Sequence, residues 1–231
     1  MAGLLTVLVM AAGGAGRGGA GRGSGDHDGD LAAVLGAARA AAVRRLLLHR
    51  VLRWGQGVAP GRVFLGRAPG AVAAGLDPPP DAVSGLTLCG ETVAEQLVDG
   101  VGALLGSGAE MGPGAGWLLI AWPVLATWRP EHAAGALEDL AAGCALAVGP
   151  VFDGGFYLLA LRGPAPWLAA LAEQAWHSPE AMGQAMAAAR AAGGEVGMLR
   201  AERALRGAGD VQAALADPLL DSELATILRA G

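Results

Sequence analysis

Residues 145–161 read ALAVGPVFDGGFYLLAL, and this stretch says more about the fold than any other part of the chain. Two apolar runs, Ala145–Val148 and Phe156–Leu161, flank a turn with Asp-Gly-Gly at positions 153–155. Short apolar runs bounded by turn residues are typical of strands that are buried on both faces. An acid and two glycines at the end of such a strand lie where open α/β sheets bind ligands. An ordinary turn is the alternative, because Asp-Gly is a common turn signal.

Similar apolar runs lie before and after this stretch, separated by helical patterns. We expect further strands at Leu4–Met10, Val63–Leu65, Leu86–Leu88, Trp117–Ala121 and Val196–Leu199. We expect helices at Leu31–Trp54, Glu91–Leu105, Pro130–Ala142, Pro179–Ala192, Val211–Ala216 and Ser222–Leu228. Asp30 is the expected N-cap of the longest helix, and Gly55 is its expected end. This alternation predicts a single α/β domain over residues 1–231, a three-layer sandwich with a mostly parallel sheet.

The composition excludes several classes of protein. Of the 231 residues 53% are hydrophobic, yet no apolar run approaches the roughly 20 residues that a membrane helix needs. We therefore expect a cytoplasmic protein with no membrane span. The formal net charge of −5 argues against nucleic-acid binding, which needs a basic face. An anionic small ligand remains open, because arginines gather before Arg67: Arg17, Arg22, Arg39, Arg44, Arg45, Arg50, Arg53 and Arg62.

A glycine-rich segment follows the first expected strand. It contains Gly13, Gly14, Gly16 and Arg17, with Arg22 shortly after them. Backbone N–H groups at the end of a strand can hold phosphate oxygens, and an arginine can neutralise them with two hydrogen bonds. The segment resembles the Leu-Ala-Ala-Gly-x-Gly-x-Arg loop of nucleotidyltransferases. It also matches the Gly-x-Gly-x-x-Gly dinucleotide fingerprint, but neither a helix nor the expected acid follows, so a dinucleotide oxidoreductase is the weaker alternative.

Residues 26–30 read DHDGD, and their alternating acids are similar to the start of a calcium-binding loop. Leu31 stands where that loop needs a glycine, and Ala37 stands where it needs a bidentate glutamate. We therefore expect solvated loop acids before a helix.

The segment DGGFYLLAL at 153–161 resembles the Asp-Gly-Gly-Tyr-Tyr-Leu-Leu-Gly-Leu segment of a bacterial glycosyltransferase-like family. That family is often described as selenium-domain-associated or arsenosugar-biosynthesis transferases. WHSPE at 176–180 is similar to its Trp-Ser-Thr-Pro-Glu helix entry, and DVQAAL at 210–215 is similar to half of its closing motif. The resemblance implies a nucleotide-diphospho-sugar transferase fold of type A and a transferase that uses a nucleotide-activated sugar.

The resemblance also implies roles for the matching residues. Asp153 would be catalytic, and Asp210 would help to hold a divalent metal ion, Mg²⁺ or Mn²⁺. The glycine-rich segment does not match the first loop of this family, but in the same function its backbone N–H groups and arginines would bind the phosphates of a nucleotide or nucleotide sugar. The residues expected to bind the substrate are Gly154, Gly155, Trp176 and Ser178.

Departures from the family pattern leave the activity open. The acid that follows the family's central strand is missing, because Ala121 and Trp122 stand there, and Trp122 suggests either core packing or stacking on a ligand. The chain also has no lysine, although the family's first loop carries one. Bridging metal ions normally need more than one carboxylate. Nucleotidyl transfer on the same fold, or a non-catalytic relative that binds a nucleotide or a partner, are therefore the alternatives.

Overall fold

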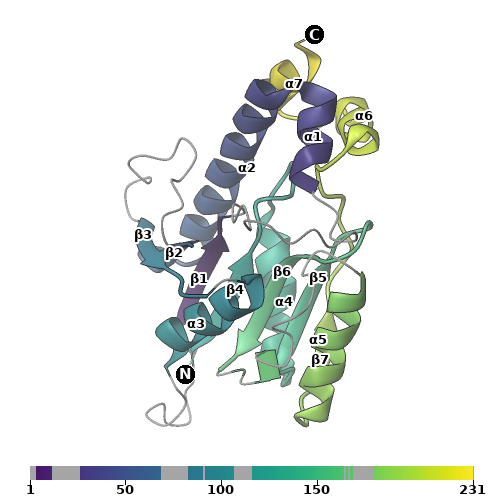
Figure 1. Ribbon diagram of the computed structural model, residues 1–231. Helices are drawn as coiled ribbons and strands as arrows, with labels where there is room; N and C mark the ends of the chain where they lie inside the picture. Colours follow the sequence, from purple (N-terminus) through teal and green to yellow (C-terminus); the bar gives the residue numbers. More distant parts are fainter. Residues whose placement is uncertain are drawn as a thin grey trace.

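The computed structural model describes residues 4–11, 27–68, 83–90, 92–106, 116–163, 165, 167–168 and 179–230. Seven strands form one sheet in the order β3-β2-β1-β4-β6-β5-β7 (Figure 1). The strands are β1 (Leu5–Met10), β2 (Val63–Arg67), β3 (Val83–Thr87), β4 (Trp117–Ala121), β5 (Leu146–Pro150), β6 (Phe156–Arg162) and β7 (Val196–Met198). Neighbouring strands are parallel except where β6 pairs with β4 and with β5. The predicted mostly parallel sheet is confirmed.

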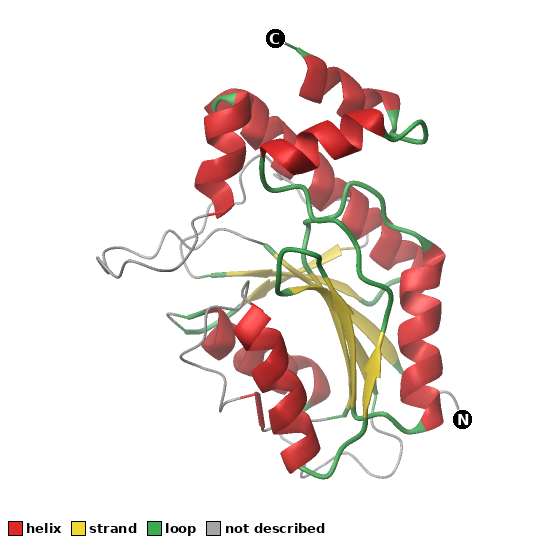
Figure 2. Ribbon diagram, turned by 90° about the vertical axis from the view of Figure 1, so that its right-hand side faces the viewer, coloured by secondary structure: helices red, strands yellow, loops and turns green. Residues whose placement is uncertain are grey.

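Helices cover both faces of the sheet, and further helices lie beyond the carboxyl ends of its parallel strands (Figure 2). They are α1 (His27–Leu35), α2 (Ala37–Val58), α3 (Val93–Leu105), α4 (Pro130–Ala142), α5 (Pro179–Ala191), α6 (Ala208–Ala216) and α7 (Ser222–Arg229). In β1, Val7 and Val9 pack with α2 and α4, whereas Leu8 and Met10 pack in the cluster that contains α3 and α5. The strand is apolar except for Thr6 because both of its faces are buried. The predicted three-layer sandwich is therefore confirmed.

The predicted single helix over Leu31–Trp54 is wrong, and so is the N-cap role of Asp30. Two helices occupy this region and are separated at Gly36, whose φ of 78° is a conformation that glycine tolerates best. The first of them begins at His27, so Asp30 lies inside α1, and residues 27–30 are helical instead of a loop. Asp26 lies outside the described residues.

Gly55 does not end α2, which continues to Val58. A Cβ at Gly55 would lie 3.2 Å from Val7 Cγ1 and 3.3 Å from Val63 Cγ1. Glycine at position 55 therefore allows α2 to pack closely on β1 and β2, and it does not cap the helix. The other described elements agree with prediction to within three residues at each end.

A third hydrophobic cluster joins α1 and α2 to the C-terminal helices above the carboxyl edge of the sheet, the side at which the parallel strands end. Here α1 and α7 pack on α2, and α6 packs on α1 and α7 (Figure 1). Arg39 of α2 donates to the carbonyl oxygens of Ile227 at 3.0 Å and Leu228 at 2.7 Å. Arg50 of α2 pairs with Asp221, which caps α7. Among the described residues, no helix is both long and apolar enough to cross a membrane.

Candidate functional site

The order of the strands points to one place on the carboxyl edge. After β1 the chain adds β2 and β3 on one side, and it then crosses to β4 on the other side of β1. In open α/β sheets, ligands bind at the carboxyl ends of the strands where the order reverses in this way. Met10 and Ala121 end the two strands at this point. The segment that follows β1 contains the residues expected to bind phosphate, Gly13, Gly14, Gly16, Arg17 and Arg22, which lie outside the described residues.

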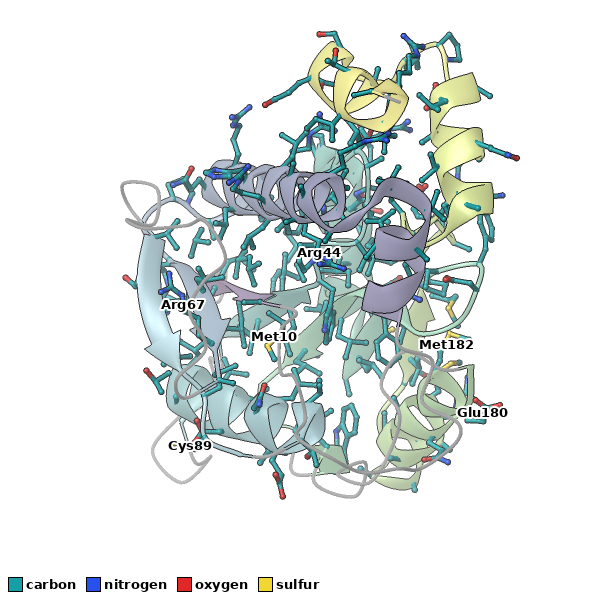
Figure 3. All side chains as sticks on the ribbon, turned by 45° about the horizontal axis from the view of Figure 1, so that its top comes forward. Met10, Arg44, Arg67, Cys89, Glu180 and Met182 are labelled. Carbon is teal, nitrogen blue, oxygen red and sulfur yellow. The ribbon has the colours of Figure 1, made fainter. Side chains whose placement is uncertain are left out.

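Arg67 adds a cation to the same edge, and the sequence reasoning did not single it out. It is the last residue of β2, directly after the Gly66 that pairs with Met10 of β1. Its Nε and Nη2 atoms are buried and have no hydrogen-bond partner among the described residues. Figure 3 looks toward this edge and shows Arg67 near Met10, with Arg44 of α2 projecting over the same edge. A buried N–H group without a partner costs about 1–3 kcal/mol, so an acceptor from a ligand would be favourable here.

Three of the arginines that the sequence analysis considered for an anionic ligand have structural partners instead. Arg39 and Arg50 hold α7, and Arg62 donates to Thr6 Oγ1 at 2.8 and 3.1 Å at the other end of the sheet. For these three arginines, the clustering in the sequence therefore reflects helix docking and strand packing.

The predicted turn at 153–155 lies between β5 and β6, at the carboxyl end of β5. Gly154 and Gly155 have φ of 101° and 76°. Two glycines stand here because glycine adopts positive φ more readily than any other residue. Asp153 Oδ2 accepts a hydrogen bond from Arg206 Nη1 at 3.1 Å, and the same nitrogen donates to the Gly154 carbonyl at 3.3 Å. The guanidinium is almost fully buried, whereas the Asp153 side chain is 41% exposed. Arg206 therefore fixes a carboxylate that solvent and ligands can reach.

Asp210 lies close to Asp153, because both contact Arg206. Its Oδ2 accepts from the backbone N–H groups of Gly207 at 3.0 Å and Arg206 at 3.2 Å, which caps α6. Its Oδ1 accepts from Arg203 Nη1 at 3.2 Å. Asp153 and Asp210 thus lie in one region of the carboxyl edge.

The described residues around Asp210 do not fit a divalent ion. Both carboxylate oxygens already have donors, and the nearest charged groups are arginines. No cluster of three or more His, Cys, Asp or Glu side chains in the described ranges could hold a metal ion. A divalent ion is normally bound by several hard oxygen ligands, so a metal at Asp210 would have to displace these hydrogen bonds.

Trp122, at the position where the resemblance implies an acid, is a core residue. Only 2% of it is exposed, and its ring lies 5.8 Å from that of Phe156. Core packing is thus the correct alternative for this residue. The two other predicted substrate-binding residues, Trp176 and Ser178, lie outside the described residues.

A pocket of about 220 Å³ lies beside the turn, between the segment that follows β4 and helix α6. Its lining includes apolar residues with little exposure, Leu125, Ala204 and Leu205. Its polar lining residues are Thr127, Arg129, Glu202, Arg203, Asp210 and Asp217. Except for Asp210, the sequence analysis missed these residues, because no local motif marks them and they come together only through the fold.

The pocket borders a buried polar cluster. His132 Nδ1 accepts from the Arg129 backbone N–H at 3.3 Å, and His132 Nε2 lies 3.5 Å from Glu202 Oε1. Burial lowers the pKa of His132, although the neighbouring Glu202 acts in the opposite direction. Tyr157 donates to the Arg200 carbonyl at 3.3 Å, and burial raises the pKa of Tyr157 to about 12. Both rings are thus held neutral near pH 7.

Comparison with known proteins supports the fold. The structure is similar to a proposed nucleotide-diphospho-sugar transferase from Desulfovibrio desulfuricans G20, with a TM-score of 0.64 and 18% identity over 99% of this chain and 95% of that one. It is also similar to the homologue of Mycobacterium tuberculosis Rv0371c from Mycobacterium sp. strain JC1, with a TM-score of 0.53 and 13% identity over 100% of both chains. No family model and no curated protein sequence matches the chain.

These likenesses define the class of the fold. The domain has the fold of nucleotide-diphospho-sugar transferases, which confirms the predicted fold and relates the chain to glycosyltransferase-like proteins at the level of the fold. A shared fold does not fix the chemistry, which has to be argued from the residues of the site.

Proposed function

We propose that this domain is a transferase that binds a nucleotide-activated sugar at the carboxyl edge of its sheet and passes the sugar to an acceptor. The reversal of strand order between β1 and β4 carries the proposal, because the glycine- and arginine-rich segment follows β1 at that point. The proposed phosphate-binding residues are Gly13, Gly14, Gly16, Arg17 and Arg22. Arg67 supports the proposal, because phosphate oxygens of the donor would pair with its buried N–H groups.

Asp153 has the geometry of a residue that orients the acceptor. Arg206 holds one of its oxygens, and the side chain remains accessible. In the proposed reaction an acceptor hydroxyl attacks the anomeric carbon of the donor, the new C–O bond forms, and the nucleoside diphosphate leaves. Asp153 would take the hydroxyl proton. Gly154, Gly155, Trp176 and Ser178 would bind the substrate, and catalysis would come from positioning and from stabilising charge on the leaving diphosphate.

A nucleotide-binding domain without catalysis is the second candidate. Trp122 favours it, because a buried aromatic ring lies where the resemblance implies a metal-binding acid. The hydrogen bonds of Asp210 also favour the non-catalytic candidate, since N–H groups already occupy both oxygens of that carboxylate and leave none for a metal ion.

Calorimetry with UDP-, GDP- and dTDP-sugars, each with and without Mg²⁺ or Mn²⁺, tests the proposal. We expect one of these donors to bind, and we expect Arg67→Gln to weaken its binding about ten- to a hundredfold, since a hydrogen bond to a charged group contributes about 1.5–3 kcal/mol. Arg53→Gln is the matched control, because Arg53 is an exposed arginine of α2. Absence of binding by every donor, or equal losses in the two variants, would refute the donor site.

Product analysis separates the remaining alternatives. Release of a nucleoside diphosphate with sugar transferred to an added acceptor supports the proposed reaction. Formation of a nucleotide sugar from a nucleoside triphosphate and a sugar phosphate, with release of diphosphate, supports nucleotidyl transfer instead. Donor binding without either product favours the non-catalytic candidate.

A further inference from the structure

We propose that the pocket between the segment after β4 and α6 is the acceptor site, and that it takes a small neutral molecule rich in hydroxyl groups, of the size of a monosaccharide or a polyol. The assignment as an acceptor site rests on the proposed function, whereas the binding of such a molecule can be tested without it.

The pocket adjoins the turn that carries Asp153. The Phe152 backbone N–H donates to the Glu202 carbonyl at 3.1 Å, and Glu202 lines the pocket. Arg206 links the two places a second time, because its side chain holds Asp153 and its backbone N–H donates to Asp210, another lining residue. A molecule in the pocket would thus lie beside the accessible carboxylate that we propose as the proton acceptor.

The volume limits the size of the ligand. At about 220 Å³ the pocket is smaller than the roughly 300–1,000 Å³ of sites that bury drug-sized molecules. It has room for a single ring or a short chain. A nucleotide sugar is too large for it, so the pocket fits the acceptor better than the donor.

The charges of the lining favour hydroxyl groups over ions. Arg203 is paired with Asp210 at 3.2 Å, and Glu202 lies 3.8 Å from Arg200 and 3.5 Å from His132. The lining thus offers hydrogen-bond donors and acceptors side by side, and its two arginines, Arg129 and Arg203, offset most of the charge of its three carboxylates. A hydroxyl group suits such a lining, because it both donates and accepts hydrogen bonds. An anion would meet three carboxylates there, since Asp217 also lines the pocket.

Phe152 offers an apolar surface next to these polar groups. It is 67% exposed, although large apolar side chains are usually buried, and it immediately precedes Asp153. The Arg203 guanidinium lies 5.7 Å from the centre of the ring, which joins the ring to the pocket. Sugar rings have an apolar face of C–H groups that can lie on an aromatic ring, while their hydroxyls reach polar neighbours.

Saturation-transfer NMR and calorimetry with methyl glucoside, methyl galactoside and myo-inositol test the inference. Glycine and inorganic phosphate are the charged comparison probes, each measured in the same way. We expect at least one of the three hydroxyl-rich probes to bind in the millimolar range, and Phe152→Ala and Asp217→Asn to weaken it about tenfold or more. Leu219→Ala is the matched control, because Leu219 is 80% exposed, lies two residues from Asp217 and does not line the pocket. Unchanged circular dichroism and unfolding temperature will show that each variant is folded.

The two proposals fail in different ways. If none of the hydroxyl-rich probes binds, if only glycine or phosphate binds, or if Phe152→Ala and Leu219→Ala bind equally well, the inference is overturned. Nucleotide-sugar binding, measured on the same samples, should be unchanged by Phe152→Ala. Donor binding without probe binding would therefore refute only the acceptor site. Probe binding without donor binding would refute the proposed function and with it the role as an acceptor site, but not the binding of hydroxyl-rich molecules in the pocket.

Discussion

At the scale of single residues, the pair of Asp153 and Arg206 joins the turn after β5 to the segment before α6. The Arg206 side chain is almost fully buried, and it donates to both Asp153 and the Gly154 carbonyl. Removing it leaves a buried carbonyl without a donor. We expect Arg206→Met to lower the free energy of unfolding by about 2 kcal/mol, as for the loss of hydrogen bonds from a charged group. Urea denaturation measures this change.

The neighbouring pair of Arg203 and Asp210 is the control for this prediction. It has a similar separation of 3.2 Å, but the Arg203 side chain is 54% exposed. Exposed ion pairs contribute about 0–1 kcal/mol, so Arg203→Met should change stability by less than Arg206→Met. An equal or larger effect of Arg203→Met would contradict the structural importance that we give to the buried pair.

The residues of the site differ in how far the sequence could reveal them. Asp153, Gly154 and Gly155 form a local motif at the end of a strand, so the sequence was sufficient to predict the turn and its position, whereas their role stays a prediction. Arg206 is separated from Asp153 by 53 positions, and no local pattern links the two. Arg67 was missed for a related reason. Its importance comes from buried atoms without partners, which only the packing around β2 reveals.

At the scale of elements, the break between α1 and α2 gives a second prediction. Gly36 has φ 78° and ψ 155°, a backbone region open to almost no residue except glycine. We expect Gly36→Ala to destabilise the fold by about 1–3 kcal/mol through backbone strain, since no atom lies close enough to clash with the new Cβ. Thermal unfolding followed by circular dichroism measures the loss.

Gly57, an exposed position inside α2, should show the opposite effect. A Cβ there meets no other atom within 4 Å, and its backbone is helical. Gly57→Ala should therefore stabilise the fold by about 0.5–1 kcal/mol, because glycine loses more conformational freedom than alanine in a helix. A Gly36→Ala variant as stable as Gly57→Ala would contradict the backbone strain that we assign to Gly36.

Local sequence rules predicted the bounds of most elements, and they failed where contacts with distant residues determine where a helix ends. Pro130 marked the first turn of α4, and apolar runs marked the buried strands. The alanine-rich pattern continues across Gly36, so periodicity alone could not reveal the break. At Gly55 the sequence suggested an end of the helix, but the glycine is there because Val7 and Val63 lie against it.

At the scale of the whole molecule, the sheet order follows from contacts between distant segments. The alternation of helices and strands predicted a mostly parallel sheet, but it could not show that β6 enters between β4 and β5 in the opposite direction. Nor could it show that α1, α6 and α7, from the two ends of the chain, share one hydrophobic cluster. The pocket beside Asp210 exists only because of that cluster, since α6 forms one of its walls.

A second long-range contact, between His132 and Glu202, makes the stability of the whole fold depend on pH. His132 joins the start of α4 to Glu202, and burial lowers its pKa below the ordinary value of 6.5. The unfolded chain therefore binds a proton more readily than the folded one. Stability is fully present above about pH 6.5 and falls as the pH drops from there toward the lower pKa of the folded state. Urea denaturation at pH 7.5 and 5.5 should show this loss. In His132→Asn, which keeps an acceptor for the Arg129 N–H and cannot titrate, the loss should be smaller, and an equal loss in both proteins would assign it to other groups.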